Sequence, residues 1–322
     1  MDIDFLKNKK ALVTGGNGFI GSHMVSRLVK SDCTVFAMIR DTSDVWRLEE
    51  VRDSINLIKL DIRDSEVLSQ WLAKIKPDYI FHMAAYGVDS RQKDYVTAAE
   101  INIIGTLNMV KAASKIGCEK LLNTGTSMQY GNKKGSIEEE DYYDPTNIYG
   151  STKGAATIIA HQTAVENNID IATIIPFGVF GEKEGSHKFF PHVILSALRD
   201  EEIKLSPCEQ YRDYCYVENI IDGFIMAAGS SEVKNEVFNI GCGRVHQLKH
   251  YVELMMKRLE AGKKVSYGAV GYRKNDLWSP QPDLTKISTR LGWNPRVSLE
   301  EGIDRTIEWF RGNYEKYSVK GR

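Results

Sequence analysis

The chain has 322 residues, with 42 Lys and Arg against 43 Asp and Glu, so its formal net charge is −1. This length accommodates two domains, and a hydrophobic share of 42% supplies material for their cores. Balanced charge without a long Lys/Arg run disfavours nucleic acid and anionic membranes as partners and favours small-molecule chemistry.

The first half of the chain alternates strand-like and helix-like segments. Residues 10–14 form a short β-rich run, residues 15–21 a glycine-rich turn, and residues 22–30 a helix with its apolar positions on one side. Further apolar runs of strand length lie at residues 34–39, 56–60, 79–83, 120–124 and 171–175. Six strands separated by helices predict an α/β fold with a doubly wound parallel sheet.

The second half of the chain has a different pattern. Helices are expected near residues 189–199, 217–228 and 250–259, with shorter strands and proline-containing loops between them. We therefore expect one domain at residues 1–175 and a smaller, mainly C-terminal α/β lobe at residues 176–322. No repeat or low-complexity linker separates the two, so crossings of the chain back to the first domain are allowed.

The glycine-rich turn at residues 15–21 matches GxGxxG from Gly16 and GxxGxxG from Gly15. Its glycines permit a tight turn and a close approach of the backbone to a pyrophosphate, while the following helix presents its N-terminus to the anion. With a strand before it and a helix after it, the turn predicts a Rossmann domain that binds NAD or NADP. The residues expected to contact the dinucleotide here are Gly15, Gly18, Phe19, Ile20 and Gly21.

The end of the second strand indicates which dinucleotide is bound. An acidic residue that grips the adenosine ribose is expected about 20 residues beyond the glycines. Ile39 occupies that region and Arg40 follows it, and a guanidinium there pairs with a ribose 2′-phosphate. This favours NADP, with NAD as the alternative. In the competing interpretations Asp41 contacts the ribose, or Arg40 only covers the surface.

Tyr149 and Lys153 stand four residues apart, which places them on one face if the segment is helical. An ammonium near a phenol is expected to lower the Tyr pKa from its reference of about 10 toward the working pH. The pair would then serve as a general acid/base at a carbinol.

The glycine turn, the segment Thr124 to Gly131 and the YxxxK pattern follow one another at sensible spacings. Together they resemble the extended short-chain dehydrogenase/reductases, in the branch of nucleotide-sugar epimerases, dehydratases and reductases. The resemblance covers nearly the full length. Its further segments are LDIRD at residues 60–64, FHMAA at 81–85, NIIGTLN at 102–108, RDYCYV at 212–217 and LGW at 291–293.

The resemblance implies a catalytic set. Tyr149 would exchange a proton with the sugar hydroxyl or keto oxygen, and Lys153 would hold the nicotinamide ribose. Thr126 matches the Ser/Thr that hydrogen-bonds the same sugar oxygen. His82, at a strand end, is interpreted as structural.

The resemblance also implies binding residues for the cofactor and for a nucleotide-diphosphate sugar. On the cofactor side Asp61 and Ile62 would bracket the adenine, and Ala84 and Ala85 would line the channel. On the substrate side, in the second lobe, the set is Arg212, Arg273 and His187. The two arginines would clamp the diphosphate with their bidentate forks. Alternatively, Arg212 forms an ion pair with Asp213 or another carboxylate, Arg273, in an Arg-x-x-Asp loop, also forms an ion pair, and His187 with Lys188 faces solvent.

Several reactions remain open within this branch. Dehydratases place an acidic pair directly after the catalytic threonine, where this chain has Ser127 and Met128, so 4,6-dehydration is disfavoured unless another loop supplies an acid. Arg40 favours an NADPH-using 4-ketoreductase or the reverse dehydrogenase. A 4-epimerase that retains NAD is the alternative, and the intact Thr126, Tyr149 and Lys153 speak against a non-catalytic cofactor-binding protein.

Assembly and location follow with less detail. In this family the helices beginning near Asn102 and Tyr149 pair with their copies, so we expect a homodimer. Five scattered cysteines without a CxxC pair argue against disulfides and zinc knuckles, and dispersed histidines argue against a metal site. The sequence has no apolar run of about 18 residues and no signal-like N-terminus, which predicts a cytoplasmic protein.

Overall fold

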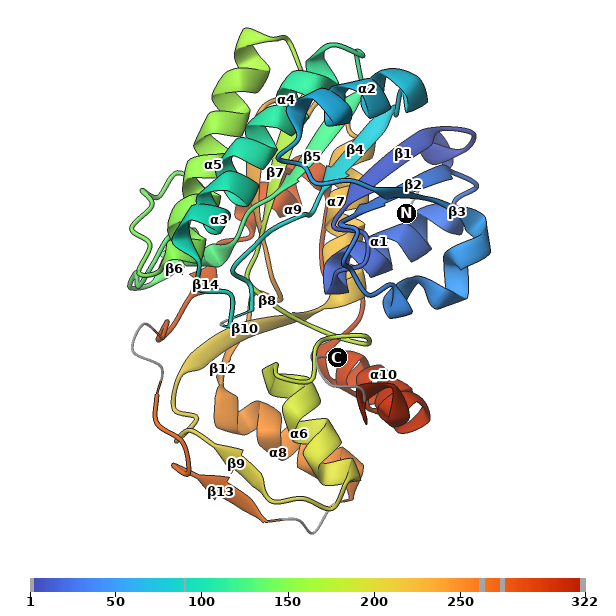
Figure 1. Ribbon diagram of the computed structural model, residues 1–322. Coiled ribbons are helices and arrows are strands. Elements are labelled where there is room, and N and C mark those ends of the chain that lie inside the picture. Colours follow the sequence, from blue (N-terminus) through green and yellow to red (C-terminus); the bar gives the residue numbers. More distant parts are fainter. Residues whose placement is uncertain (1–2, 90, 261–263, 273–275, 319–322) are drawn as a thin grey trace.

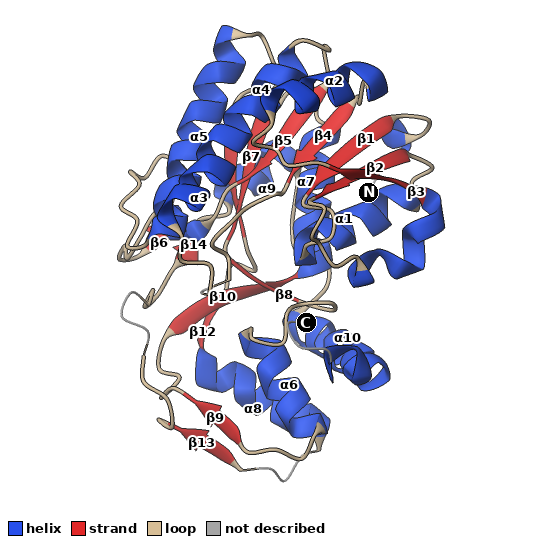
Figure 2. Cartoon of the chain, viewed as in Figure 1, coloured by secondary structure: helices blue, strands red, loops and turns tan. Residues whose placement is uncertain are grey.

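The computed structural model describes residues 3–89, 91–260, 264–272 and 276–318. It has a larger lobe built on a parallel sheet and a smaller lobe below it (Figure 1). Figure 2 shows the strands of the large sheet as one layer with helices on both sides. Within the described ranges, no helix combines the length and the apolarity that crossing a lipid bilayer requires.

The large sheet has seven parallel strands in the order β11-β7-β5-β4-β1-β2-β3. The strands are β1 (Lys10–Thr14), β2 (Thr34–Ile39), β3 (Ile55–Lys59), β4 (Tyr79–His82), β5 (Lys120–Thr124), β7 (Ile171–Pro176) and β11 (Glu236–Ile240). The predicted α/β class with a doubly wound parallel sheet is confirmed. The seventh strand, β11, was not among the six predicted, because it lies in the second half of the chain.

Side chains alternate between the two faces of the sheet. In β1, Leu12 belongs to the core under α2 (Ser65–Ile75), α4 (Gly105–Ser114) and α5 (Ile148–Glu166), whereas Ala11 and Val13 belong to the core on the opposite face. That opposite face is covered by α1 (Phe19–Val29) and α7 (Val217–Gly229), which contact each other. Both faces are therefore buried, as the continuous apolar strands require.

The smaller lobe combines short strands with helices. A three-stranded sheet has the order β12-β10-β8, and β9 pairs with β13. Its strands are β8 (Gly178–Phe180), β9 (Ile203–Leu205), β10 (Tyr211–Tyr216), β12 (Val245–Gln247) and β13 (Val265–Tyr267). Its helices are α6 (Phe189–Leu198), α8 (Leu248–Leu259) and α10 (Leu299–Asn313). Stacked Phe180 and Phe190, with ring centroids 4.3 Å apart, join β8 to α6.

Further short elements connect these parts. They are α3 (Tyr95–Ala99), the 3-10 helix η2 (Trp46–Ser54), the π-helix η3 (Glu100–Ile104), the 3-10 helix η4 (Ser127–Gln129) and α9 (Thr285–Leu291). Strand β6 (Ser136–Ile137) pairs in parallel with β14 (Gln281–Pro282), so a late segment of the chain also touches the large lobe.

Helix α7 packs on the large sheet, although a helix at residues 217–228 was expected in the second lobe. Lys120 of β5 fixes the C-terminal end of α7. Its buried ammonium donates to the carbonyls of Ala227 at 3.2 Å, of Val233 at 2.9 Å and of Ser230. A buried cation at a helix C-terminus satisfies carbonyls that have no partner within the helix. The chain thus returns across residue 175 with α7 and β11.

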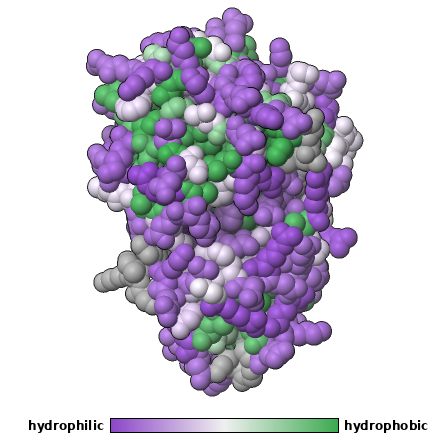
Figure 3. All heavy atoms as spheres, turned by 90° about the vertical axis from the view of Figure 1, so that its right-hand side faces the viewer, coloured by the Kyte–Doolittle hydropathy of each residue, from purple (hydrophilic) through white to green (hydrophobic). Residues whose placement is uncertain are grey.

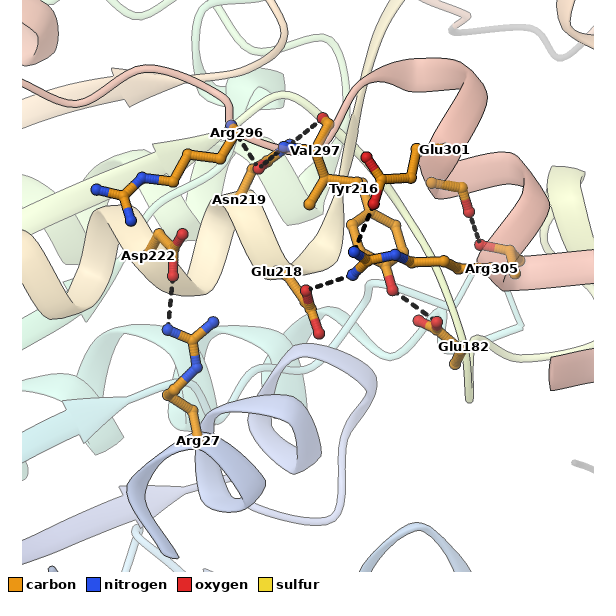
Figure 4. Close-up of polar contacts among 12 residues, drawn as sticks. Arg27, Glu182, Tyr216, Glu218, Asn219, Asp222, Arg296, Val297, Glu301 and Arg305 are labelled. Atoms are coloured by element: carbon orange, nitrogen blue, oxygen red, sulfur yellow. Dashed lines mark hydrogen bonds and ion pairs between the residues drawn. The ribbon is translucent and has the colours of Figure 1, made fainter. Parts of the chain in front are cut away.

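Polar contacts tie α7 to both neighbouring helices (Figure 4). Arg27 of α1 pairs with Asp222 of α7 at 2.6 Å, and Arg305 of α10 pairs with Glu218 at 2.9 Å. Asn219 accepts the backbone N–H of Val297 at 3.0 Å. Helix α7 therefore contacts both lobes.

The face at the right of Figure 1 shows how the two lobes differ at the surface (Figure 3). Hydrophobic residues gather over the larger lobe there, and the smaller lobe is mostly hydrophilic with one small apolar area near its tip.

Candidate active site

The glycine turn connects β1 to α1 at the carboxyl edge of the large sheet, and Gly18 is the N-cap of α1. Gly15 has φ +65°, and a Cβ there would lie 2.9 Å from the backbone of Ala84. At Gly21 a Cβ would lie 2.2 Å from the carbonyl oxygen of Gly15. Side chains are excluded at these positions, so the turn forms a backbone cradle at a helix N-terminus that fits a pyrophosphate.

The other predicted cofactor residues lie along the same edge of the sheet. Phe19 and Ile20 occupy the first turn of α1 and are partly exposed. Ala84 and Ala85 follow β4 and are half-buried, and the Ala84 N–H donates to the Thr14 hydroxyl at 3.1 Å. The turn and the end of β4 are thereby fixed to each other.

Side chains of both positive and negative charge lie where the adenosine end of the cofactor is expected. Arg40 follows β2, is exposed, and has no ion pair among the residues that the structure describes. Asp41 lies 3.6 Å from the ammonium of Lys59. The Asp61 carboxylate is bound by Arg63 at 2.7 Å, and this hydrogen bond lowers the pKa of Asp61.

Ile62, the neighbour of Asp61, is buried, and its carbonyl accepts the Asn108 amide at 3.1 Å.

Tyr149 and Lys153 lie in the first turns of α5, as their spacing predicts. Asn147 is the N-cap and accepts the backbone N–H of Gly150 at 2.9 Å. Lys153 is 1% exposed, and burial lowers its pKa to about 8. Thr126, the N-cap of η4, is buried and hydrogen-bonds the Tyr149 side chain.

The pKa of Tyr149 departs from the expectation. Burial raises it to about 12, and the hydrogen bond with Thr126 opposes that rise. Lys153 was expected to lower the pKa of Tyr149, but it does not do so here. Burial instead lowers the pKa of Lys153 itself. Desolvation therefore dominates the pKa values of both residues in this structure.

Arg212 lies in β10 and forms an ion pair, as one of the two interpretations of its role had it. Its partner is Asp276, at 2.5 Å, which also accepts the Gln210 amide at 2.6 Å. Asp213 faces elsewhere, since its carboxylate accepts the backbone N–H of Cys242 and is buried, which raises its pKa to about 6. Arg273 lies outside the described residues.

His187 and Lys188 lie between the lobes rather than facing solvent alone. The His187 ring lies 3.7 Å from the carboxylate of Asp89, and Lys188 donates to the Val88 carbonyl at 2.8 Å. The same loop after β4 also reaches the predicted acid/base. Its Gly87 packs closely on Tyr149, since a Cβ at Gly87 would lie 3.3 Å from the Cβ of Tyr149. The loop after β4 thus contacts the His187 segment at Val88 and Asp89 and Tyr149 at Gly87.

No metal centre emerges in the part of the chain that is described. His246 and His250 are close, with stacked rings 4.4 Å apart, but no group of three or more potential ligands gathers in the described ranges. The five cysteines are all free.

Sequence reasoning missed several residues that fix the site. One is Asp276, which forms the ion pair with Arg212. Another is Asn102 in the π-helix, whose side chain accepts the Tyr86 N–H and donates to the Tyr86 carbonyl, both at 2.8 Å. A π-helical turn is a frequent mark of a functional site, but it has no short sequence signal.

Comparison with known proteins gives a consistent result. Residues 11–241 match the family described as "NAD dependent epimerase/dehydratase family". The UDP-glucose 4-epimerase of Mycolicibacterium smegmatis is 30% identical over 322 residues, covering 94% of this chain and 98% of that protein.

Solved structures show the same similarity. The UDP-glucose 4-epimerase of Thermotoga maritima, determined with UDP-glucose, has a TM-score of 0.88 at 29% identity and covers 95% of this chain and 99% of its own. MoeE5, in complex with UDP-glucuronic acid and NAD, has a TM-score of 0.84 at 27% identity, with 94% and 99% covered.

Proposed function

The chain belongs to the NAD dependent epimerase/dehydratase family, and from this membership we propose that it performs hydride transfer at carbon 4 of a nucleotide-diphosphate sugar. The observation that carries the proposal is the geometry around Tyr149. Its side chain hydrogen-bonds Thr126, and the buried Lys153 lies one helical turn away. Its ring lies against Gly87, in the loop that runs from Ala84 beside the glycine cradle.

Each residue has a defined task in this reaction. Tyr149 gives a proton to, or takes it from, the oxygen on carbon 4, and Thr126 hydrogen-bonds the same oxygen. Lys153 binds the nicotinamide ribose and supplies the positive charge that favours the phenolate. NAD(P) bound in the cradle would supply the hydride donor or acceptor for carbon 4. Burial raises the pKa of Tyr149 to about 12 and Lys153 does not lower it in this structure, so the proton transfer would require the Lys153 charge to act on the phenol during turnover.

The dinucleotide would be held by the cradle at residues 15–21, with Asp61 and Ile62 beside the adenine and Ala84 and Ala85 along the channel. For the adenosine ribose we propose NADP. The exposed guanidinium of Arg40, without an ion pair among the described residues, suits a 2′-phosphate. MoeE5 holds NAD, so NAD is the alternative.

The preferred reaction is reduction of a 4-keto sugar, or its reverse, because Arg40 suits the phosphorylated cofactor. A 4-epimerase is the second candidate, supported by similarity along nearly the whole chain to the M. smegmatis UDP-glucose 4-epimerase. Dehydration is disfavoured, since the residues after Thr126 are the buried Ser127 and the thioether Met128, and neither removes a proton readily.

On the substrate side, Arg212 would bind the diphosphate by exchanging Asp276 for it. A guanidinium binds carboxylate and phosphate with the same fork, so the ion pair holds the Arg212 side chain in a position from which it can bind a phosphate. Arg273 and His187 remain proposed contacts of the same ligand.

We also propose a homodimer through the outer faces of α4 and α5. Ile158 and Val165 of α5 are 61% and 53% exposed, and Ile104, next to α4, is 47% exposed. Apolar side chains at helical spacing on a surface favour association. Ile158→Glu should convert the dimer to a monomer by light scattering at micromolar concentration, and a monomeric wild-type protein would refute the proposal.

The absorption spectrum of purified protein and a product assay test the reaction together. A site that is empty on purification and binds added NADPH, with a 4-keto nucleotide sugar as oxidant, supports the reductase. Tightly retained NAD(H), with interconversion of two 4-epimers and no net cofactor consumption, supports the epimerase. Absence of both activities across UDP-, dTDP-, GDP- and CDP-sugars would overturn the proposed function.

A further inference from the structure

Three buried side chains, Thr14, His82 and Thr106, form a hydrogen-bonded chain that begins beside the glycine turn and ends on the backbone carbonyl of Asn102. The Asn102 side chain continues the connection to helix α5, and we call Thr14, His82, Thr106 and Asn102 the His82 relay. Each of the four is 0% exposed. Thr14 ends β1 and His82 ends β4, whereas Thr106 lies in α4 and Asn102 in the π-helix before it. None of the four touches the reacting atoms in the mechanism proposed above.

The direction of each hydrogen bond follows from counting donors. The Thr14 hydroxyl accepts the N–H groups of Met83 and Ala84, both at 3.1 Å, so its single proton goes to His82 Nδ1 at 2.8 Å. Thr106 donates its proton to the backbone carbonyl of Asn102 at 2.6 Å and therefore accepts from His82 Nε2 at 3.0 Å. The ring is thus neutral with its proton on Nε2.

The far end of the relay reaches the helix that carries Tyr149. The Asn102 side chain clamps the Tyr86 backbone and donates to the Thr152 hydroxyl at 2.9 Å. Thr152 in turn donates within α5, to the Ile148 carbonyl at 2.9 Å or the Tyr149 carbonyl at 3.1 Å. The backbone of residues 83–87 is consequently held between the cradle at one end and Tyr149 at the other.

We propose that His82 is a positioning residue, whose fixed tautomer sets the alignment of the cradle with Tyr149. A cation at this point is excluded, because burial and the nearby Lys153 charge lower the pKa of His82 to about 3. The ring therefore acts only as a directional connector. This inference rests on the proposed function for its effect on turnover, and on the geometry alone for the tautomer and the rigidity of residues 83–87.

The matched pair Thr106→Val and Thr106→Ser tests the relay. Valine has nearly the shape of threonine but accepts no hydrogen bond from Nε2, whereas serine keeps the hydroxyl. Thr106→Val should lower kcat about ten- to a hundredfold, because a small misalignment of reacting groups has effects of that size. KM should change by less than about twofold, and Thr106→Ser should retain kcat within about threefold of wild type.

Two further measurements do not depend on turnover. In wild-type protein, nitrogen NMR at pH 5 should show both His82 and His23 neutral among the seven histidines, because burial also lowers the pKa of His23 to about 4. The signal that His82→Gln removes belongs to His82 and should carry its proton on Nε2. Hydrogen exchange in a peptide covering residues 83–87 should quicken in Thr106→Val and not in Thr106→Ser.

The outcomes separate the relay from the proposed function. A proton on Nδ1, or equal exchange and equal kcat in the two Thr106 variants, overturns the relay. If wild-type protein turns over no nucleotide sugar, the proposed function fails, and the NMR and exchange results still decide whether the relay stands.

Discussion

The proposed cofactor side and the proposed substrate side of the site are built in different ways. Around the cradle, position is set by backbone, because a side chain at Gly15 or Gly21 would collide with neighbouring backbone atoms. On the substrate side, position is set by side chains on short strands and loops, such as the pair of Arg212 and Asp276. The backbone atoms of the first arrangement are the same whatever the side chains, whereas single substitutions change the groups that the second presents.

The largest effect is expected where the two sides meet. Tyr149→Phe keeps the ring but removes the hydroxyl, so kcat should fall about a thousandfold, within the range that a general acid/base contributes. The affinity for NAD(P)H, followed by fluorescence, should change less than about twofold because the cradle is intact. Tyr142→Phe, at a residue 73% exposed, is the control and should be neutral. Activity that persists in Tyr149→Phe would remove this phenol from the mechanism.

Lys153 provides a test of burial on the cofactor side. Its pKa is lowered from 10.5 to about 8 in the folded protein, so between these values the unfolded chain binds more protons and stability rises with pH. The unfolding free energy of wild type relative to Lys153→Met should therefore increase by about 3 kcal/mol from pH 8 to pH 10.5.

Urea unfolding of the cofactor-free proteins at several pH values measures this difference. Lys59→Met, at an exposed position, is the control for replacing a lysine by methionine. A flat profile for Lys153→Met would mean that this ammonium is not desolvated.

Arg212 tests the substrate side. Arg212→Ala should weaken binding of nucleoside diphosphates about ten- to a hundredfold by calorimetry, since a charge-assisted hydrogen bond contributes roughly 1.5 to 3 kcal/mol. Asp276→Asn removes the competing carboxylate charge and should bind at least as tightly as wild type. Equal weakening in both variants would show that the ion pair supports the fold rather than the ligand.

Arg40 should show the smallest effect, because its side chain is exposed. Arg40→Ser should reduce the preference for NADPH over NADH about tenfold in fluorescence titrations, with NADH affinity nearly unchanged. Arg52→Ser, another exposed arginine, should leave the ratio as it is. A wild-type protein that binds both cofactors equally would favour NAD and the epimerase.

The sequence predicted the large lobe well because its signals are local. Strand, glycine turn and helix follow one another within residues 10–30, and the four-residue spacing of Tyr149 and Lys153 places both in the first turns of one helix. These features depend on neighbours in the chain, which a single sequence displays.

Features that join distant segments escaped prediction. The contact of Arg212 with Asp276 spans 64 residues and that of Thr14 with His82 spans 68. Strand β11 resembles any short apolar run, and only its pairing with β7 identifies it. The pKa of Tyr149 was expected to fall because the lysine was visible in sequence, whereas the burial that raises it was not.

Strand β11 has a consequence for synthesis of the protein on the ribosome. All six residues of β7 are buried, and one of its edges is covered by β11. Until residue 240 has emerged, that edge is bare, and at roughly 5 to 20 residues per second the gap after residue 176 lasts roughly 3 to 13 seconds. A nascent chain in this interval presents an open template for strand addition, so rare codons between residues 177 and 235 would lengthen its exposure to aggregation.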